Sequence, residues 1–342
     1  VTGAETEDMS VGKFLDSIIK NEDLKLILLG NLGYFHDDPY SLSLNYYSTA
    51  QGSYYSGGAS FIKGGSQKLS DHLATFVRDH GGEVIFNHIV TGINIRDGRA
   101  TGVTCKRKHS QEALEVTADN IVANNAVPNV ADMLPQAEAL ELRNEFRDLR
   151  PGASLLTLYL GFSKPPSALG HSFYSTFVYD GSVSSQADIL RNNRDDFSRR
   201  SFTFVDYSQI DSGLAPAGKS VGAICCTDYL DDWDYLSKRE YDEKKKIIAR
   251  GFIERLEKII PGISNYVEYY EIATPATVKR YTLNPGGAVY GFAQTPSRNT
   301  INTFKSVENI YFASAWGKTG GGFSGAIYGG YLCAFNILRK KR

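Results

Sequence analysis

The stretch that most constrains this chain covers residues 309–338, NIYFASAWGKTGGGFSGAIYGGYLCAFNIL. Its first apolar residues, 310–313, are typical of a buried central strand. The glycines at 320–322 follow, and the spacing of apolar residues after Gly325 predicts a helix. Glycine lets a flat or anionic ligand approach the backbone closely, and the N–H groups at a helix start carry partial positive charge. The pattern therefore predicts a strand, a turn and a helix, which either pack without a ligand or hold one at the helix start.

This stretch resembles the closing segment of flavoproteins related to phytoene desaturase, carotenoid isomerase and retinol saturase. In that family a strand ending in A-G-A-W is followed by G-G-G-x-x-G-A-I-x-x-G, and the helix start faces the flavin. The matching letters here are ASAW at 313–316, GGG at 320–322 and GAI at 325–327, with Ser314 where glycine is usual. The resemblance implies that the FAD-binding residues of this stretch are Ser314, Ala315, Trp316, Gly321, Gly322, Phe323, Gly325 and Ala326.

Residues 61–105 predict a helix followed by a small β-meander. The helix has one apolar face, and Gly81-Gly82 stop it. Strands are expected at 83–86 and around 90–95, and Asp97-Gly98 predicts a hairpin turn into a strand at 101–105. The pattern is common in α/β folds, but it also resembles the family's middle segment, K-G-G-x-x-x-L followed by G-G-E-I-x-x-N-x-x-V-x-x-I. That resemblance implies that the backbone of Val90 contacts the adenine of FAD; a plain core valine is the competing interpretation.

Two further segments carry candidate site residues. Residues 118–126 predict a strand returning to the flavin-binding sheet, and Asn125 at its end either touches the cofactor or caps the turn at Pro128. Residues 273–292 resemble the family's T-P-x-T-x-x-R-Y and later G-x-x-Y-G. The resemblance makes Arg280 and Tyr290 the candidate catalytic residues, in a wall between flavin and substrate. Arg280 equally fits a structural pair with a carboxylate.

The remaining sequence predicts a substrate domain with little chemistry of its own. Helices are expected at 11–29, 137–149 and 241–260, the last ended by Pro261-Gly262. Strands are expected at 154–162, 201–205 and 221–226 in a mixed sheet with helices on one side. The tyrosine-rich residues 41–60 either line a long apolar channel or pack as ordinary core and interface.

Composition excludes several functional classes. The 342 residues carry a net charge of −1, which indicates no polyanion partner such as a nucleic acid. The four cysteines show no C-x-x-C spacing and the histidines no metal spacing, so neither zinc nor a disulfide framework is predicted. No apolar run reaches the ~20 residues of a membrane span. The basic end, RKKR at 339–342, is typical of a solvated terminus. A reducing, cytoplasmic compartment is expected, with peripheral membrane contact suiting an insoluble substrate.

The opening unit of a flavin domain, a strand, G-x-G-x-x-G and a helix, is not found. The literal G-x-G-x-x-G at 320–325 lies too near the end for a βαβ unit. The resemblance, over residues 11–338, therefore matches the later part of a family member. We expect this fragment to hold FAD weakly or not at all and to be inactive alone. The expected parts are a substrate-domain helical segment at 1–57, the middle of the FAD domain at 58–128, the substrate domain at 129–300 and the end of the FAD domain at 301–342.

These observations predict an α/β fold: a partial Rossmann-like FAD/NAD(P)-binding domain of the flavin amine oxidase and phytoene desaturase type, with an inserted mixed-sheet substrate domain. The resemblance implies an FAD-dependent oxidoreductase of the kind found in carotenoid biosynthesis. It would act on carotenoid- or retinoid-like polyenes by hydride exchange with flavin N5. Two alternatives stay open: a flavin-free isoprenoid- or lipid-binding module, and a flavin amine oxidase, which is disfavoured because Ala315 stands where those oxidases carry an acidic residue. The polyene, the direction of the reaction and the oligomeric state are not predicted.

Overall fold

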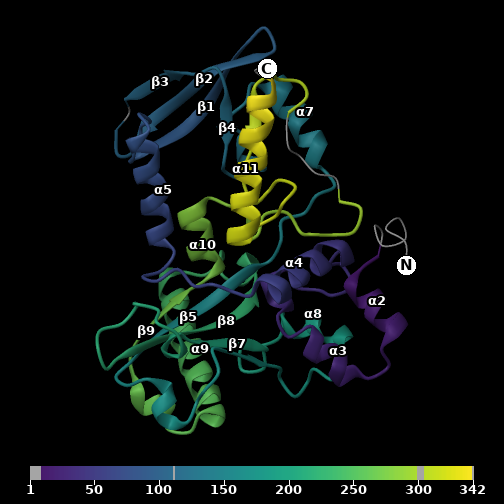
Figure 1. The fold of residues 1–342 in the computed structure, drawn as a ribbon, viewed down its shortest axis with the longest axis vertical. Coiled ribbons are helices and arrows are strands. Elements are labelled where there is room, and N and C mark those ends of the chain that lie inside the picture. The colour runs from purple at the N-terminus through teal and green to yellow at the C-terminus, as the bar shows by residue number, and fades with distance from the viewer. Residues whose placement is uncertain (1–8, 111, 299–303, 341–342) are drawn as a thin grey trace. The chain divides into compact units, whose positions relative to one another are not determined.

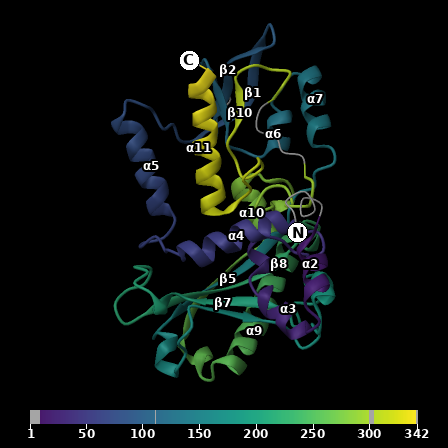
Figure 2. The same cartoon turned by 45° about the vertical axis from the view of Figure 1, so that its right-hand side comes forward.

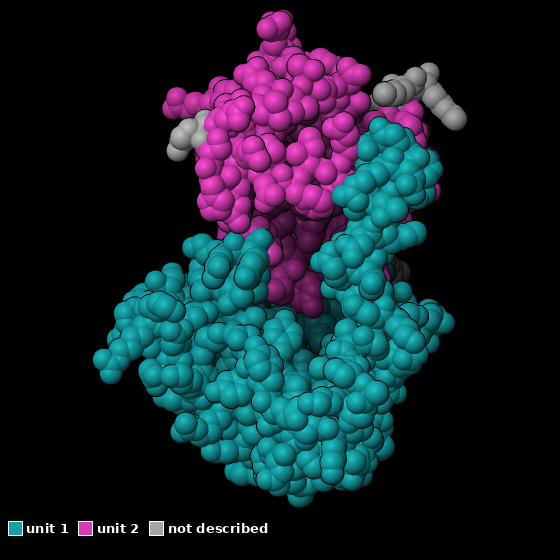
Figure 3. All heavy atoms as spheres, turned by 90° about the vertical axis from the view of Figure 1, so that its left-hand side faces the viewer, with its two compact units in different colours: residues 1–82, 153–281, 295–297 teal, residues 83–152, 282–294, 298–342 magenta. Residues whose placement is uncertain are grey.

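The computed structural model describes residues 9–110, 112–298 and 304–340, which form an α/β fold. The chain divides into two compact units (Figure 3): unit 1 is Val1–Gly82, Ala153–Tyr281 and Thr295–Ser297, and unit 2 is Glu83–Gly152, Thr282–Gln294 and Arg298–Arg342. The predicted boundaries separate cofactor-binding from substrate-binding parts, whereas these units are defined by compactness alone. The predicted boundaries therefore stay a prediction. The opening residues 1–8, the predicted boundary at 300/301 and the last two residues of the basic end lie outside the described residues.

A five-stranded sheet forms the centre of unit 1 (Figure 1). Its order is β6 (Ser175–Val178), β7 (Phe202–Asp206), β8 (Ser220–Asp228), β5 (Ser154–Phe162) and β9 (Val267–Ala273). The strands predicted at 154–162, 201–205 and 221–226 are confirmed as β5, β7 and β8. Every neighbouring pair is antiparallel, where the sequence predicts a mixed sheet. Short edge strands such as β6 carry too few apolar residues to be found from periodicity alone.

Helix α9 (Lys238–Ile259) covers one face of this sheet, as Figures 1 and 2 both show. Alternate residues of a strand point to the same face, so Leu156, Leu158 and Leu160 of β5 meet Phe252 and Leu256 of α9 in one core. The helix begins at a capping box in which Ser237 and Glu240 satisfy each other's backbone N–H groups. The opposite face of β5 is only partly covered, because Thr157 is half-buried and Tyr159 is exposed.

The N-terminal helices of unit 1 build a second core. The single helix predicted over residues 11–29 is wrong: the structure has α2 (Val11–Ile18) and α3 (Glu22–Leu28). The break has a local cause, since the Asn21 side chain accepts a hydrogen bond from the Leu24 N–H and starts a new helix. The tyrosine-rich stretch forms α4 (Leu44–Gly57), started in the same way by Ser43. Shorter elements of this unit are α8 (Ile189–Asn192) and the 3-10 helices η1 (Leu32–Tyr34), η2 (Pro166–Leu169), η3 (Gln186–Asp188), η4 (Tyr207–Gln209), η5 (Leu230–Asp232) and η6 (Ile263–Tyr266).

The helix predicted between Gly65 and Gly81 is confirmed as α5 (Gln67–Asp79), which belongs to unit 1. Its predicted apolar face is largely exposed, because Leu73, Phe76 and Val77 all contact solvent. Unit 1 closes with α10 (Pro275–Thr282), whose last residue the division assigns to unit 2.

Unit 2 begins with a three-stranded antiparallel meander, β1 (His88–Arg96), β2 (Arg99–Arg107) and β3 (Ala113–Thr117). The predicted hairpin turn is confirmed, and positive φ angles at both Asp97 (50°) and Gly98 (72°) match the type I′ geometry that Asp-Gly favours. The strand predicted at 83–86 is wrong. No described strand pairs with this segment, and Ile85 and Phe86 are exposed, so its backbone has no ladder in which to form a strand.

The second sheet of unit 2 has two parallel strands, β10 (Ile310–Phe312) and β4 (Ile121–Ala123). Both strands were predicted, and both contribute to one core with β1, α6 (Val127–Ala131), α7 (Gln136–Phe146) and the segment after β10. The 3-10 helix η7 (Pro285–Gly287) and α11 (Gly322–Lys340) complete the unit. The sequence segments around Val90 and Gly322 thus lie in the same compact unit.

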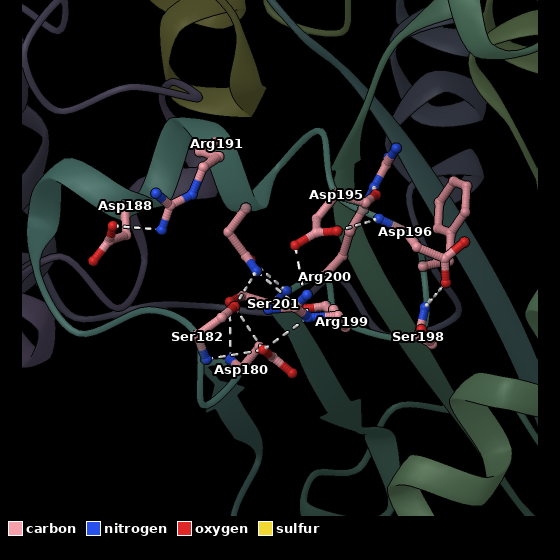
Figure 4. A network of polar contacts seen from close by, with 12 residues as sticks. Asp180, Ser182, Asp188, Arg191, Asp195, Asp196, Ser198, Arg199, Arg200 and Ser201 are labelled. Atoms are coloured by element: carbon pink, nitrogen blue, oxygen red, sulfur yellow. Dashed lines mark hydrogen bonds and ion pairs between the residues drawn. The ribbon is translucent and has the colours of Figure 1, made fainter.

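A network of polar contacts holds residues 180–201 of unit 1, a segment that includes η3 and α8 (Figure 4). At its centre the Arg200 guanidinium, 3% exposed, donates to Asp228 at 2.7 Å and to Asp232 at 2.9 Å, and its Nε donates to the Asp195 carbonyl. The Trp233 indole N–H donates to the other oxygen of Asp228, which is fully buried. The buried carboxylate of Asp228 therefore depends on Arg200 for its compensating charge.

We expect Arg200→Met to lower the free energy of unfolding by about 3–5 kcal/mol, because it leaves the Asp228 charge buried without a partner. The matched control is Arg147→Met, since Arg147 pairs with Asp148 at the surface, where such a pair contributes about 0–1 kcal/mol. Urea unfolding followed by circular dichroism measures both. Equal, small effects of the two substitutions would show that Asp228 does not need the guanidinium.

Candidate functional site

The candidate cofactor site lies in unit 2, where the two parallel strands end. Ala123, the last residue of β4, is the register partner of Phe312, the last residue of β10. The segments that follow both strands therefore leave the sheet at the same edge, which in open α/β sheets is the edge where ligands bind. One segment contains Asn125, which is half-buried, and the other contains Ser314, Ala315 and Trp316.

Ser314 stands where glycine is usual, and the turn that contains it is closed by two hydrogen bonds. Its hydroxyl accepts a hydrogen bond from the Trp316 N–H at 3.3 Å, and its carbonyl accepts one from the Gly317 N–H at 3.0 Å. Trp316 is a core residue: it is buried, and its ring lies edge-on to Phe292 with 4.8 Å between centroids. The side chains of Ser314 and Trp316 are therefore engaged within the protein, which leaves the half-buried Ala315 and the backbone of this turn for a ligand.

Tyr290 and Gly291 pack directly on the closing segment. Gly291 has φ +80°, and a Cβ at this position would lie 2.3 Å from the Ala315 carbonyl oxygen. A Cβ on Gly321 would lie 2.6 Å from the Cα of Tyr290. Both glycines are required by close backbone contact, so two motifs that are about thirty residues apart in the sequence form one packed junction.

The start of α11 is open. Gly322 has φ +76° and no atom within 4 Å of its Cβ position, and Phe323 is exposed beside it. The N–H groups of a first helical turn have no partner within the helix, and the helix dipole adds partial positive charge there. Gly325 and Ala326 follow in that first turn and a half. This start therefore suits an electron-rich or anionic edge of a ligand.

The two glycines in the middle of α11, Gly329 and Gly330, differ in their surroundings. A Cβ on Gly329 would lie 2.7 Å from the Thr319 hydroxyl oxygen, whereas nothing lies within 4 Å of a Cβ on Gly330.

Val90 lies on β1 opposite Cys105, immediately before a bulge at Thr91. It is partly exposed, and its neighbour Ile93 enters the unit 2 core. The contact between the Val90 backbone and adenine stays a prediction, as does the role of Asn125.

Arg280 lies in unit 1 and Tyr290 in unit 2. Arg280 is exposed near the end of α10, with its guanidinium 5.3 Å from the centroid of the Tyr281 ring. No ion pair of Arg280 is found within the described part of the chain, so the structural pairing with a carboxylate is not seen. The T-P-x-T motif before it has a clear structural role. Thr274 is fully buried, and its hydroxyl accepts from the Thr277 N–H at 3.3 Å and caps α10.

Sequence reasoning missed the second candidate surface, the face of the unit 1 sheet opposite α9. Tyr159 of β5 stands on this face, 51% exposed, beside Thr157 and the Cys225 thiol of β8. Alternation in SLLTLYLGF, with leucines on one face and Thr157 and Tyr159 on the other, was the available signal. We call this set, with the aromatic residues at its end, the tyrosine face; it comprises Thr157, Tyr159, Cys225, Tyr174, Tyr207 and Phe61.

Burial governs the acid–base behaviour of the tyrosine face. It raises the pKa of Tyr207 to about 12, and it raises the pKa of Tyr159 and of Tyr174 as well. Burial also raises the pKa of the Cys225 thiol. A raised pKa keeps each of these groups protonated and uncharged at neutral pH. The tyrosine face is therefore uncharged, with hydroxyls that donate hydrogen bonds.

Two tyrosines of the tyrosine-rich helix α4 pack as ordinary core, and the predicted channel stays a prediction. Tyr46 and Tyr47 pack edge-on to Phe35 in the N-terminal core, and the Tyr47 hydroxyl donates to the Leu28 carbonyl. Tyr54 and Tyr55 are exposed.

Within residues 9–110, 112–298 and 304–340, no group of three or more His, Cys, Asp or Glu side chains is placed to hold a metal ion. None of the helices described is both long and apolar enough to cross a bilayer.

Comparisons with known proteins agree on one family. The family model described as flavin containing amine oxidoreductase matches residues 5–338. Prolycopene isomerase from Daucus carota is 26% identical over 296 residues, which are 82% of this chain and 44% of the relative. All-trans-retinol 13,14-reductase from Danio rerio is 23% identical over 97% of this chain and 58% of its own length. The chain thus spans about half the length of the curated relatives it matches.

Solved structures show the same fold. An oxidoreductase from Methanosarcina mazei matches with a TM-score of 0.66 at 16% identity, over 97% of this chain and 70% of that one. Wild-type putrescine oxidase bound to putrescine matches with a TM-score of 0.61 at 13% identity, over 98% of this chain and 69% of that one.

The packed junction predicts opposite effects at two glycines. We expect Gly291→Ala to lower the free energy of unfolding by about 2 kcal/mol or more, because the new Cβ overlaps the Ala315 carbonyl and φ is positive. Gly330→Ala should raise it by about 0.5–1 kcal/mol, because the site is open and alanine favours a helix. Chemical denaturation of the two variants measures the difference. Similar effects of both would mean that the junction does not confine Gly291.

Proposed function

Because this chain belongs to the flavin containing amine oxidoreductase family, we propose that it supplies part of an FAD site and the substrate surface of an enzyme that acts on carotenoid- or retinoid-like polyenes. The observation that carries the proposal is the junction of Tyr290-Gly291 with Ala315 and Gly321 beside the carboxyl ends of β4 and β10. The matched relatives named prolycopene isomerase and all-trans-retinol 13,14-reductase support the substrate class.

The residues present fit the ring end of FAD. A flat ring can approach the backbone closely only where no side chain intervenes. Gly322 has no side chain, and no atom lies within 4 Å of its Cβ position. The residues that would hold the ring and its ribityl side are Ser314, Ala315, Trp316, Gly321, Gly322, Phe323, Gly325 and Ala326. The Val90 backbone would contact the adenine, and Asn125 would either touch the cofactor or cap the turn at Pro128. The strand–glycine turn–helix unit of β10 and α11 would serve the ring end, and the described residues contain no second unit of this kind for the pyrophosphate.

Bound FAD supplies hydride acceptance or donation at N5, which changes or isomerises a conjugated C–C system. The chain's own residues contribute binding and electrostatics. The start of α11 would stabilise negative charge on the ring edge through the N–H groups of its first turn and its dipole. Tyr290, held against Gly321, would form the wall between ring and substrate, and Arg280 is the second candidate there.

The tyrosine face suits a long apolar substrate. Aromatic rings offer flat contact area, and each phenol adds a single polar group. Tyr159 and Tyr207 are uncharged at neutral pH, as tyrosine ordinarily is, and burial raises the pKa of each further, so their rings offer a hydrocarbon an uncharged contact. A conjugated substrate needs orientation and exclusion of water more than acid–base groups, which agrees with an uncharged face.

A cytoplasmic compartment and peripheral membrane contact stay predictions, and so does inactivity of this chain on its own. Amine oxidation is the alternative activity within the family, and Ala315 disfavours it. A flavin-free lipid-binding module is the alternative from another class, and the two experiments below separate it from the proposal.

The first experiment concerns the flavin. We expect weak binding, with dissociation constants for FAD and riboflavin within about tenfold of each other, because charge-assisted bonds to the pyrophosphate, each about 1.5–3 kcal/mol, are lacking. Flavin fluorescence quenching measures both. Gly322→Asp should weaken riboflavin binding by placing a negative charge at the start of α11. The control, Gly330→Asp, alters an open glycine farther along the same helix.

Purified protein that carries stoichiometric yellow flavin would contradict the expected weak binding. No ring-absorbance change at any riboflavin concentration would contradict the flavin site itself and favour the flavin-free module.

The second experiment concerns the substrate. We expect Tyr159→Ala to weaken the binding of lycopene and of all-trans-retinol by about two- to tenfold, since one aromatic contact contributes about 0.5–1.5 kcal/mol beyond its area. Tyr235→Ala is the matched control, because Tyr235 is 72% exposed in the same unit but lies in the loop between η5 and α9. Ligand absorbance shifts measure the affinities. If the two variants bind alike, the tyrosine face is not the substrate surface.

A further inference from the structure

A row of small polar side chains crosses the tyrosine face of unit 1. The register pairs Thr203 of β7 with Cys225 of β8, and it pairs Cys225 with Thr157 of β5. Directly paired residues of neighbouring strands stand on the same face of a sheet, so these three side chains form one line across three strands. We call this set, Thr203, Cys225 and Thr157, the threonine row.

We infer that the threonine row binds the uncharged polar end of an amphiphilic polyene, an alcohol or an aldehyde, and selects such a ligand over a hydrocarbon of the same skeleton. The inference rests on the proposed function, because it adds a specificity to the proposed substrate surface. Among the substrates of that proposal it favours the retinoid-like class, whose members end in an oxygen function.

The side chains of the threonine row have hydrogen-bonding capacity that the protein does not use. All three are half-buried. The Thr157 hydroxyl and the Cys225 thiol lie 3.6 Å apart, in a weak contact where either group can donate. The Thr203 hydroxyl has no hydrogen bond to any residue that the structure describes. Since each threonine hydroxyl offers one donor and two acceptor positions, the row can take a further polar group.

Beside the row, the same face becomes apolar. Val205 of β7 pairs with Ala223 of β8, and Ala223 pairs with Tyr159 of β5. Val205 and Ala223 are both buried. Tyr207 follows β7, and its ring lies 5.9 Å from that of Tyr174. This apolar floor lies two residues along the strands from the threonine row, about 7 Å away. The face therefore has a polar and an apolar part, which matches a ligand with a polar end and an apolar body.

The residues that continue the row carry no charge. Phe177 of β6 pairs with Thr203, and Ala273 of β9 pairs with Thr157. The nearby carboxylate of Glu271 is paired with the Lys245 ammonium group at 2.7 Å. A carboxylate or an ammonium group of a ligand would thus be buried here without a compensating charge, which is costly. A neutral alcohol or aldehyde suits the row, and an acid or an amine does not.

Hydrogen bonding explains the selection against hydrocarbons. Solvent bonds to half-buried hydroxyls when no ligand is bound, and a ligand that covers them without replacing those bonds loses affinity. A ligand hydroxyl placed over Cys225 is next to both threonines, because directly paired side chains have Cβ atoms about 4.5–5.5 Å apart. Each hydrogen bond gained in this way strengthens binding by about threefold to tenfold.

The test compares three ligands that share one polyene skeleton. They are all-trans-retinol, its hydrocarbon axerophthene, in which hydrogen replaces the hydroxyl group, and all-trans-retinoic acid. Quenching of protein fluorescence measures their dissociation constants for the whole 342-residue chain at neutral pH. We expect retinol to bind about threefold to tenfold more tightly than either of the other two ligands.

Two variants change this preference in opposite directions. Thr157→Val combined with Thr203→Val removes both hydroxyls and keeps the β-branched shape that strands favour. The affinities for retinol and axerophthene should then agree within about twofold, through weaker binding of retinol alone. Cys225→Ser puts a strong hydrogen-bonding group at the centre of the row and should increase the preference for retinol. The control is Thr117→Val, at an exposed threonine of β3 in the other unit, which should leave the preference unchanged.

Three results would overturn the inference while the proposed substrate surface stands. They are equal affinities for retinol and axerophthene in the unchanged protein, an equal loss of both ligands in the double valine variant, and tightest binding of retinoic acid. Tyr159→Ala separates the two proposals, because the loss of an aromatic contact should weaken retinol and axerophthene alike. If none of the three ligands binds, the proposed substrate surface is refuted, and this inference with it.

Discussion

The buried side chain of Asn309 ties the parts of unit 2 together. Its amide oxygen accepts from the Ala100 N–H at 3.0 Å, and its amide nitrogen donates to the Ala100 and Asp119 carbonyls. Its own carbonyl starts the ladder to Ile121. One residue thus joins the meander, the approach to β4 and the start of β10. The parallel pairing that follows sets the common edge at which Asn125 and Ser314 leave the sheet.

Unit 1 is built on one sheet whose two faces differ in chemistry. The face toward α9 is filled with leucine and phenylalanine, and its buried charges are compensated, as Arg200 compensates Asp228. The opposite face carries Thr157, Tyr159 and Cys225, which are uncharged at neutral pH, and burial raises the pKa of the tyrosine and the thiol further. A strand period of two produces both faces from the same nine residues of β5.

The sequence predicted elements best where the local signal was strong. Strand β5 was predicted at its observed bounds, because leucines alternate with other residues over its whole length. The Asp97-Gly98 turn was predicted because few other pairs tolerate two positive φ angles. The break between α2 and α3 was missed, since apolar spacing continues across Asn21 while its side chain starts a new helix. The strand at 83–86 was expected from its apolar letters, but a strand exists only where a partner supplies a ladder.

For the candidate site, the sequence alone identified the glycine motifs that contain residues 291, 321 and 322. It also identified the family to which the chain belongs. Gly291 and Gly322 also have positive φ angles, a constraint that is local to the backbone and therefore visible in the sequence. Only the tertiary structure decided that Gly291 abuts Ala315, that Gly321 abuts Tyr290, and that Tyr159 stands on an uncharged face. These are contacts between residues far apart in the chain, and which residues meet depends on strand pairing and packing, which no local pattern specifies.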